Sequence, residues 1–202
     1  MTENKCRVLT SASVKQLFAT MAQMYDTEIA DKSDSKEMRL VAKFLEAIGI
    51  MDAKDFLTKF ATTIDHKLYL PFTPGSDKVP LLAQVMTCAH EHQHVVVMED
   101  EGYAGYHLNY VASPSMRAMY ESRCYVASAE VCWWRMKMLH GEGTLPDINL
   151  AKTLKAYGCD AKASAPAVKS YTKACKVIQK GGVGCQAAQD VITFFGWMGC
   201  KK

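Results

Sequence analysis

Three of the six histidines in this 202-residue chain lie within five positions, at His90, His92 and His94, with Glu91 among them. In a helix, residues four apart share a face, so His90 and His94 can bind one metal ion together. Glu91 lies about 100° around the helix from His90, close to such an ion without binding it. This is the H-E-x-x-H pattern, in which two histidines bind zinc and the glutamate acts as a general base. The segment therefore predicts a zinc-dependent hydrolase.

The residues around this motif favour a buried metal site over a surface helix. Ala89 precedes the motif and Val95–Val97 follow it, so continuous apolar chain flanks the histidines. Burying imidazole rings without a ligand or a hydrogen-bond partner costs free energy. His92 lies about 200° around the helix from His90, so we expect it to face away from the metal and to be hydrogen-bonded or half-exposed. A di-iron carboxylate site would need a second Glu-x-x-His motif, which the sequence lacks.

Catalytic zinc usually has three protein ligands and one water, so a third ligand is expected outside the motif. No H-x-x-G-x-x-H continuation follows His94, which leaves a carboxylate on a later helix as the natural option. Glu121 and Glu130 both lie on the next long predicted helix. Cys124 and Ser128 are small and share the face of Glu121, which leaves room for an ion. The remaining candidates are the acidic residues at 99–101 and His107, and a site without a third protein ligand is also open.

Four segments between residues 66 and 130 resemble the HExxH metallopeptidases of the gluzincin type, including small phage and bacterial metallopeptidases. They are a strand, "KLYLPF"; the motif helix, "AHEHQHV"; a tyrosine-containing segment, "YHLNY"; and "RAMYESRCY", which looks like the R-x-x-x-E-x-x-A-Y pattern of the family's ligand helix. The resemblance implies a zincin-like fold and zinc-dependent hydrolysis of a peptide or protein substrate. It also implies that Glu121 is the third Zn2+ ligand beside His90 and His94, with Glu91 as the general base.

Two positions depart from the family's pattern. His92 fills a position that is usually apolar, and Cys124 stands where alanine is expected. The first departure weakens the expectation of apolar packing behind the motif helix. The second changes little, because cysteine is also small.

Peptide hydrolysis also needs a hydrogen-bond donor for the oxyanion that forms at the attacked carbonyl. Arg117 lies one helical turn before Glu121, and we expect it either to orient that carboxylate or to form a surface salt bridge. An extended peptide could pair with the edge of the strand predicted at 66–72. The segment after the motif helix offers four candidate oxyanion donors: Tyr103, Tyr106, His107 and Tyr110.

The elements before the motif follow from the spacing of apolar residues. Alternating residues in "HKLYLPF" predict a strand over 66–72, and a turn rich in proline and glycine follows it. Apolar residues that recur at three- and four-residue steps predict helices over 14–25, 38–48 and 56–64.

Two long helices carry the candidate ligands. Pro80 begins the first, which runs to about Met98, and Pro114 begins the second. Between them, "YAGYHLNYVA" is predicted as a short strand or loop. Two or three further helices follow, interrupted at Gly158 and at Gly181–Gly182.

These elements predict a predominantly helical α+β fold, zincin-like, with a small sheet beside the motif helix and helical extensions at both ends. Residues 1–65 are expected to form an N-terminal helical segment packed on the core. Residues 66–140 form the metal-binding core and residues 141–202 a basic C-terminal helical segment, together one compact domain. The chain is 49% hydrophobic and 22% charged, which is typical of globular proteins and argues against disorder.

The C-terminal segment supports a different class of function. Residues 141–202 carry nine lysines against four acidic residues, a net charge of +5, whereas the whole chain has only +3. The alternative is therefore a non-catalytic, zinc-stabilised protein that binds nucleic acid or a protein partner through these helices. The segment lacks arginine, which argues against base-specific recognition, and a solvated lysine face is the simpler interpretation. Four lysines at helical spacing form one stripe: Lys169, Lys173, Lys176 and Lys180.

Features that the sequence lacks indicate where the protein is expected to be located. The first residues contain no apolar run typical of a signal peptide, and no apolar stretch of about 18 residues predicts a membrane span. We therefore expect a cytoplasmic or phage-associated protein that does not bind membranes. The eight cysteines include no CxxC pair, and without a signal peptide reduced thiols are favoured over disulfides.

Overall fold

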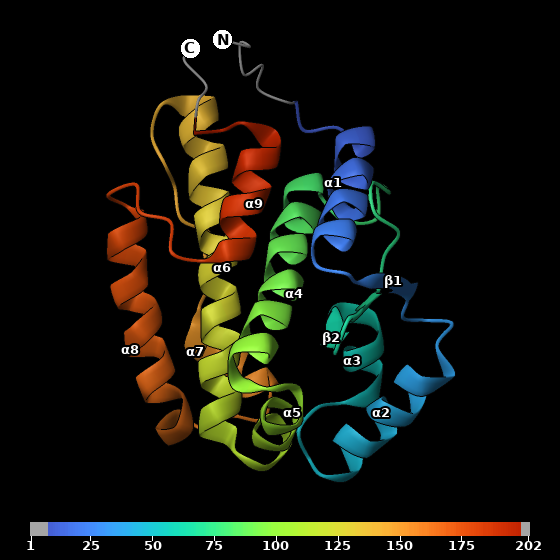
Figure 1. Ribbon diagram of the computed structural model, residues 1–202. Helices are drawn as coiled ribbons and strands as arrows, with labels where there is room; N and C mark the ends of the chain where they lie inside the picture. The colour runs from blue at the N-terminus through green and yellow to red at the C-terminus, as the bar shows by residue number, and fades with distance from the viewer. Residues whose placement is uncertain (1–7, 199–202) are drawn as a thin grey trace.

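The computed structural model describes residues 8–198 and confirms the predominantly helical α+β class (Figure 1). The strands are β1 (Glu28–Asp31), β2 (Thr62–Ile64) and β3 (Lys67–Leu70). The helices are α1 (Ser11–Met24), α2 (Lys36–Ala47), α3 (Ala53–Lys59), α4 (Leu81–Glu101), α5 (Tyr103–Ala112), α6 (Pro114–His140), α7 (Leu150–Ala156), α8 (Ala161–Ile178) and α9 (Gln186–Phe195).

The two long helices, α4 and α6, lie side by side at the centre of the molecule (Figure 1). Gly102 ends α4 with a φ of 80°, in the left-handed region that favours glycine. Pro114 lies in the first turn of α6, where its missing N–H costs nothing, and the Ser113 side chain accepts a hydrogen bond from the Met116 N–H. Gly141 ends α6 at a φ of 81°. Local chemistry therefore sets both ends of α6.

Small buried side chains allow α4 and α6 to pack closely. Cys88 and Ala89 of α4 and Ala127 of α6 are fully buried in one core cluster. Ser128 Oγ of α6 donates to the Met86 carbonyl of α4 at 3.2 Å. On the outside, α1 and α9 pack against α4, and α8 and α9 pack against α6. The faces of α4 and α6 that carry the candidate ligands therefore meet inside the protein.

The sheet lies beside α4 and has the strand order β1–β3–β2. β3 pairs parallel with β1 and antiparallel with β2, in a register that places Thr63 opposite Leu68. The strand predicted over 66–72 is confirmed as β3, but it is the central strand, so the prediction that its edge binds a peptide is wrong. The strand with an outer edge that contacts α4 is β2, within the segment 56–64 that was predicted as helix. Because β1 and β2 precede residue 66, the sheet joins the N-terminal segment to the metal-binding core.

Residues 103–112, which the sequence predicts as a strand or loop, form the helix α5. The ring of Tyr106 stacks on the rings of Tyr110 and Tyr120, with centroids 5.8 Å and 4.5 Å apart. Tyrosine has a weak intrinsic helix propensity, but here aromatic packing against α6 outweighs it. The prediction fails because this packing partner lies outside the local sequence.

The C-terminal segment forms the three helices α7, α8 and α9, within the predicted two or three. In α8, Tyr171 and Ile178 are buried against α6, and the predicted lysine stripe faces solvent on the opposite side. The exposed members of this stripe are Lys169, Lys173, Lys176 and Lys180.

The cysteines between residues 8 and 198 are free thiols, as the sequence predicts. Cys6 and Cys200 lie outside the described residues. In this part of the chain no helix combines the length and the apolar character needed to cross a membrane.

Lys32 follows β1 directly, and its buried side chain is hydrogen-bonded to residues at the start of β2. Its side chain is fully buried, and its Nζ donates to the Phe60 carbonyl at 2.9 Å and to Thr62 Oγ1 at 2.5 Å. The same Nζ lies 3.4 Å from the centre of the Phe56 ring. Burial lowers the pKa of Lys32 to about 7, and the charge of Glu91 partly opposes this effect.

This burial predicts a pH dependence of stability. The unfolded Lys32 amine has its ordinary pKa of 10.5, so between pH 7 and that value the unfolded state binds more protons than the folded state. The free energy of unfolding should therefore rise with pH in this window, by up to about 1.4 kcal/mol per pH unit from this group. Lys32→Met should remove the rise, and Lys43→Met, at an exposed position of α2, should keep it. Chemical denaturation between about pH 7 and about pH 9 measures the slopes, and equal slopes for wild type and Lys32→Met would contradict the assignment.

Candidate metal centre

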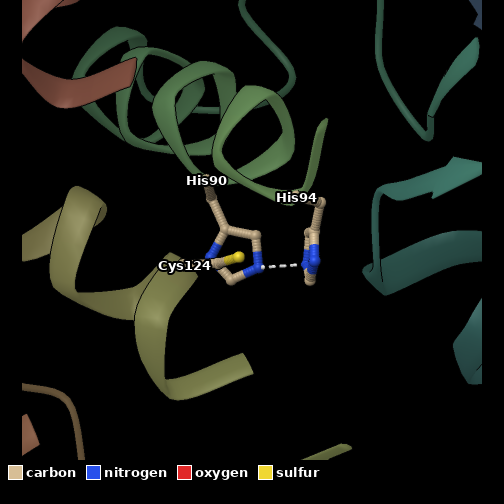
Figure 2. Close-up of side chains that lie close together, drawn as sticks. All are labelled: His90, His94 and Cys124. Carbon is tan, nitrogen blue, oxygen red and sulfur yellow. Dashed lines mark hydrogen bonds between the residues drawn. The ribbon is translucent and has the colours of Figure 1, made fainter. Parts of the chain in front are cut away.

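His90 and His94 project from α4 toward α6 as a buried pair (Figure 2). Their Nε2 atoms are 3.2 Å apart. Two nitrogen atoms that bind one zinc ion at about 2.0 to 2.1 Å, with a tetrahedral angle between them, are about 3.3 Å apart. The two imidazoles that sequence spacing pairs on one helix face therefore lie at the separation that a shared metal ion requires.

Glu121 of α6 faces both imidazoles. Its Oε2 lies 3.4 Å from His90 Nε2, and its Oε1 lies 3.6 Å from His94 Nε2. The carboxylate is only 1% exposed, and its Oε2 has no hydrogen-bond partner. A buried carboxylate oxygen without a partner is costly, and a cation between the three side chains would remove that cost. The residues present therefore fit a divalent metal ion.

Cys124, one turn after Glu121 on α6, is a second possible third donor. Together with His90 and His94 it forms a buried group that could hold a metal ion, with one donor atom from each residue all within 4.8 Å of one another (Figure 2). Complete burial raises the pKa of the Cys124 thiol well above its ordinary value, and the charges of Glu121 and Glu91 add to this effect. The geometry alone therefore offers two donor sets, with either a carboxylate or a thiol as the third member.

The other candidate ligands lie elsewhere. Glu130 accepts hydrogen bonds from the backbone N–H groups of Gly184 and Cys185 at 2.7 Å and 3.1 Å, and burial raises its pKa to about 7. It therefore anchors the start of α9, and the structure does not bring it to the histidines. His107 pairs with Asp65 at 2.8 Å. The acidic residues 99–101 are exposed at the end of α4.

The protonation states of Glu121 and His94 suit metal binding, whereas His90 would have to lose a proton that its surroundings favour. Burial raises the pKa of Glu121, but the nearby His94 and His90 and the hydrogen bond from Tyr110 outweigh burial and hold this pKa below its ordinary value. Burial lowers the pKa of His94, with partial compensation by Glu121. Burial also opposes protonation of His90, but the nearby carboxylates of Glu121 and Glu91 raise its pKa overall. Glu121 is thus ionised and His94 neutral, as metal ligands must be.

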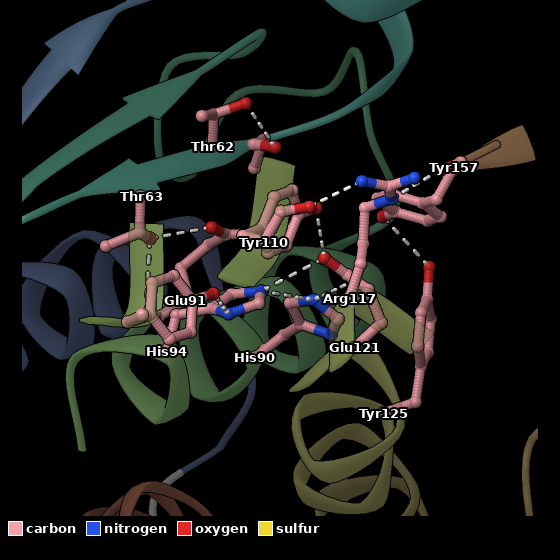
Figure 3. Close-up of polar contacts among 12 residues, drawn as sticks. Thr62, Thr63, His90, Glu91, His94, Tyr110, Arg117, Glu121, Tyr125 and Tyr157 are labelled. Carbon is pink, nitrogen blue, oxygen red and sulfur yellow. Dashed lines mark hydrogen bonds and ion pairs between the residues drawn. The ribbon is translucent and has the colours of Figure 1, made fainter. Parts of the chain in front are cut away.

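Tyrosines of α5 contact two of the candidate ligands, and Figure 3 shows Tyr110 beside Glu121. Tyr106 Oη lies 2.7 Å from His94 Nδ1. When His94 Nδ1–H donates to this oxygen, the lone pair of Nε2 is free to bind a metal ion. Tyr110 Oη donates to Glu121 Oε1 at 2.6 Å. The unpredicted helix α5 therefore supplies the outer hydrogen bonds of the metal centre.

Arg117 has a different role from the two that its spacing predicts. It is 2% exposed, so it forms no surface salt bridge, and among the described residues its hydrogen bonds do not go to Glu121. Its guanidinium donates to the backbone carbonyls of Tyr110, Val111 and Tyr157 instead. Arg117 thereby ties α5 to the segment after α7, and it supports Glu121 only through Tyr110.

Glu91 lies between α4 and the edge strand β2. It is buried, and Thr63 Oγ1 donates to Glu91 Oε2 at 2.7 Å (Figure 3). This hydrogen bond holds the Glu91 carboxylate beside the two histidines and not between their Nε2 atoms. The arrangement agrees with the predicted role of Glu91 next to a metal ion rather than on it.

His92 faces away from the centre, as its position on the helix predicts. It is completely buried rather than half-exposed, with Nδ1 2.8 Å from the Cys88 carbonyl and Nε2 3.2 Å from Thr27 Oγ1. Burial lowers its pKa to about 4, so the ring is neutral at physiological pH. His92 is therefore a hydrogen-bonded core residue.

Two cavities meet at the centre. One, of about 270 Å³, extends from the histidines toward α2 and α3. The other, of about 230 Å³, extends along α4 and α6 toward Thr87 and Ser128. His90, Glu91, Phe60 and other residues line both cavities. A substrate therefore has space on both sides of Glu91.

Two residues at this junction carry no recognisable signal in the sequence. Thr63 lies in a strand that was predicted as helix, and Tyr157 lies in the loop after α7. Tyr157 lines both cavities, its Oη is 3.4 Å from Tyr125 Oη, and its ring contacts Phe60 with centroids 5.2 Å apart. Only the tertiary fold brings these side chains to the motif.

No protein-family model, curated protein or solved structure matches the chain. The assignment of the centre therefore depends on the residues and their geometry.

Two alanine variants distinguish the third donor. If Glu121 is the ligand, Glu121→Ala should weaken zinc binding by at least about 100-fold, whereas Cys124→Ala, one turn away on the same helix, should change it little. Competition with a chromogenic chelator measures both affinities. Cobalt-loaded wild type should lack the near-ultraviolet band of a sulfur-to-cobalt bond. Such a band, with the opposite order of affinities, would assign the position to Cys124 instead.

Proposed function

We propose that the protein is a zinc-dependent metallopeptidase of the gluzincin, zincin-like type, with zinc held by His90, His94 and Glu121. One observation carries this proposal: the two imidazole nitrogens are 3.2 Å apart and each lies within 3.6 Å of an oxygen of Glu121. The donors are buried, and one carboxylate oxygen has no hydrogen-bond partner. Glu121 is favoured over Cys124 because its carboxylate is ionised, whereas burial disfavours the Cys124 thiolate.

Two histidines and one glutamate are the donor set of a catalytic zinc site with an open fourth position. When bound, zinc lowers the pKa of a coordinated water to about 7 and polarises the carbonyl oxygen of a peptide bond. The closed donor set of a structural site would need a fourth protein ligand. The two cavities beside His90 and Glu91 leave room for water and substrate instead.

Glu91 performs the proton transfers in this proposal. Its carboxylate accepts a proton from the attacking water and delivers it to the nitrogen of the leaving amine. The hydrogen bond from Thr63 at 2.7 Å keeps Glu91 Oε2 in place, and the other oxygen remains available to the water. The buried position excludes bulk solvent, which strengthens the interaction of this carboxylate with the reacting groups.

Tyr157 is the best candidate for the oxyanion donor. The four donors that the sequence predicts already have other partners: Tyr103 with His66, Tyr106 with His94, His107 with Asp65, and Tyr110 with Glu121. Tyr157 Oη has only a long contact, 3.4 Å, with Tyr125 Oη and lines both cavities. Its hydroxyl is therefore free to donate to an oxyanion that forms beside Glu91.

The outer edge of β2 supplies a binding site for the substrate backbone. β2 pairs with β3 on one side, and residues of β2 line the cavity on the other. An extended peptide can add to such an edge through main-chain hydrogen bonds. Thr63, in the middle of β2, also holds Glu91, so one strand aligns the substrate and the general base.

Glu91→Gln should abolish hydrolysis while zinc affinity stays close to that of the wild type, because the amide cannot accept the proton and the ligands are unchanged. Cleavage of a quenched fluorescent peptide library and metal titration measure the two properties. Glu99→Gln, at an exposed position on the same helix, serves as the control and should retain activity. Full activity in Glu91→Gln would refute its role as the base.

Tyr157→Phe should lower kcat by about 10² to 10³, as for the loss of one oxyanion donor. KM should change little, because the ring and its contact with Phe60 remain. Steady-state kinetics on one cleaved peptide separates the two constants. Tyr103→Phe removes a hydroxyl that bonds to His66 outside the centre and should leave kcat unchanged. Wild-type kcat in Tyr157→Phe would show that another group stabilises the oxyanion.

A further inference from the structure

The larger cavity has one wall of uniform chemistry. The α2–α3 hairpin lines it only with apolar side chains: Val41, Phe44, Leu45, Ile50, Met51 and Phe56. Among the described residues, no lysine, arginine or aspartate lines this cavity, and its two glutamates, Glu91 and Glu121, belong to the candidate metal centre. A charged side chain that entered it would lose its hydration without finding a partner on this wall.

The exposed part of this cavity is largely apolar, and its polar member, His107, is paired with Asp65. Phe44 on α2 and Val111 on α5 both line it, yet they remain 51% and 41% exposed. Leu108 on α5 is 69% exposed and lies one turn before Val111. Exposed apolar surface that continues into a cavity favours binding of an apolar group.

The direction of β2 indicates which part of a substrate enters this cavity. The larger cavity is lined by β2 as far as Ile64, whereas the smaller one extends back to Lys59, which precedes β2, and Phe60 lines both. A peptide that adds antiparallel to β2 runs in the opposite direction along the same edge. Its N-terminal residues then lie beside Ile64 and its C-terminal residues beside Lys59. Glu91 lies between, because it lines both cavities.

We propose that the cavity between the α2–α3 hairpin and the metal centre binds a bulky apolar side chain, such as leucine, methionine or phenylalanine, of the residue that precedes the cleaved peptide bond. The position of this residue relative to the bond rests on the proposed peptidase function. The preference of the cavity for apolar side chains does not depend on that function. Binding therefore tests the preference, and cleavage tests the peptidase function.

The binding test uses the zinc-loaded, full-length Glu91→Gln protein and capped alanine pentapeptides that differ only in the central residue. Isothermal calorimetry should give at least about tenfold tighter binding for central leucine or phenylalanine than for lysine or glutamate. Phe44→Glu should abolish this preference, since it places a charge at the mouth, and half-exposed Phe44 can be replaced without disrupting the core. Leu40→Glu is the matched control, because Leu40 lies one turn earlier on α2, is 69% exposed and does not line the cavity.

Equal binding of all four peptides, or equal effects of Phe44→Glu and Leu40→Glu, would overturn the inference. The cleavage test digests an unbiased peptide library with wild-type protein and identifies the new termini by mass spectrometry. Enrichment of leucine, methionine and phenylalanine before the cleaved bond supports the inference, and cleavage without it overturns the inference while the peptidase function stands. Selective binding without any cleavage would instead refute the peptidase function and support an apolar ligand site.

Discussion

The close antiparallel packing of α4 against α6 determines the position of every group in the metal centre. Met86 contacts Ser128, and one turn further along α4 His90 faces Glu121, so residue numbers rise on one helix as they fall on the other. This approach is possible because the intervening side chains are small, such as Ala89 and Ala127. A bulkier residue at this contact would separate the imidazoles from the carboxylate. The geometry of the candidate metal site is therefore a consequence of how two helices pack.

That packing encloses more charge than an apolar core tolerates alone. Glu121, His90 and His94 are buried within a few ångströms of one another, and buried Glu91 lines the same cavity. Thr63 donates a hydrogen bond to one oxygen of Glu91, and Tyr110 donates one to Oε1 of Glu121. Glu121 Oε2 remains without a hydrogen-bond partner among the described residues. Buried ion pairs seldom repay their own desolvation, so a site of this kind is expected to be retained for function. The cation that we propose here would account for both the burial and the missing partner.

The sequence predicts the parts of this site that depend on local periodicity, and fails where distant segments decide the structure. His90 and His94 share a face by spacing alone, and a proline marks the start of the helix that carries Glu121. The choice between Glu121 and Glu130 depends on how α6 is rotated against α4, which spacing does not fix. β2 and α5 were assigned wrongly because their stability comes from pairing with β3 and from packing on α6. Thr63 and Tyr157 could not be identified for the same reason.

The central claim is that the paired imidazoles and the facing carboxylate hold one divalent cation. Plasma mass spectrometry of untagged protein, purified without added metal or chelator, tests this claim most directly. The account predicts about one zinc ion per chain. A protein that carries no metal and takes up none when titrated with zinc would contradict it, because His90, His94 and Glu121 would then form a buried hydrogen-bonded cluster without a cation.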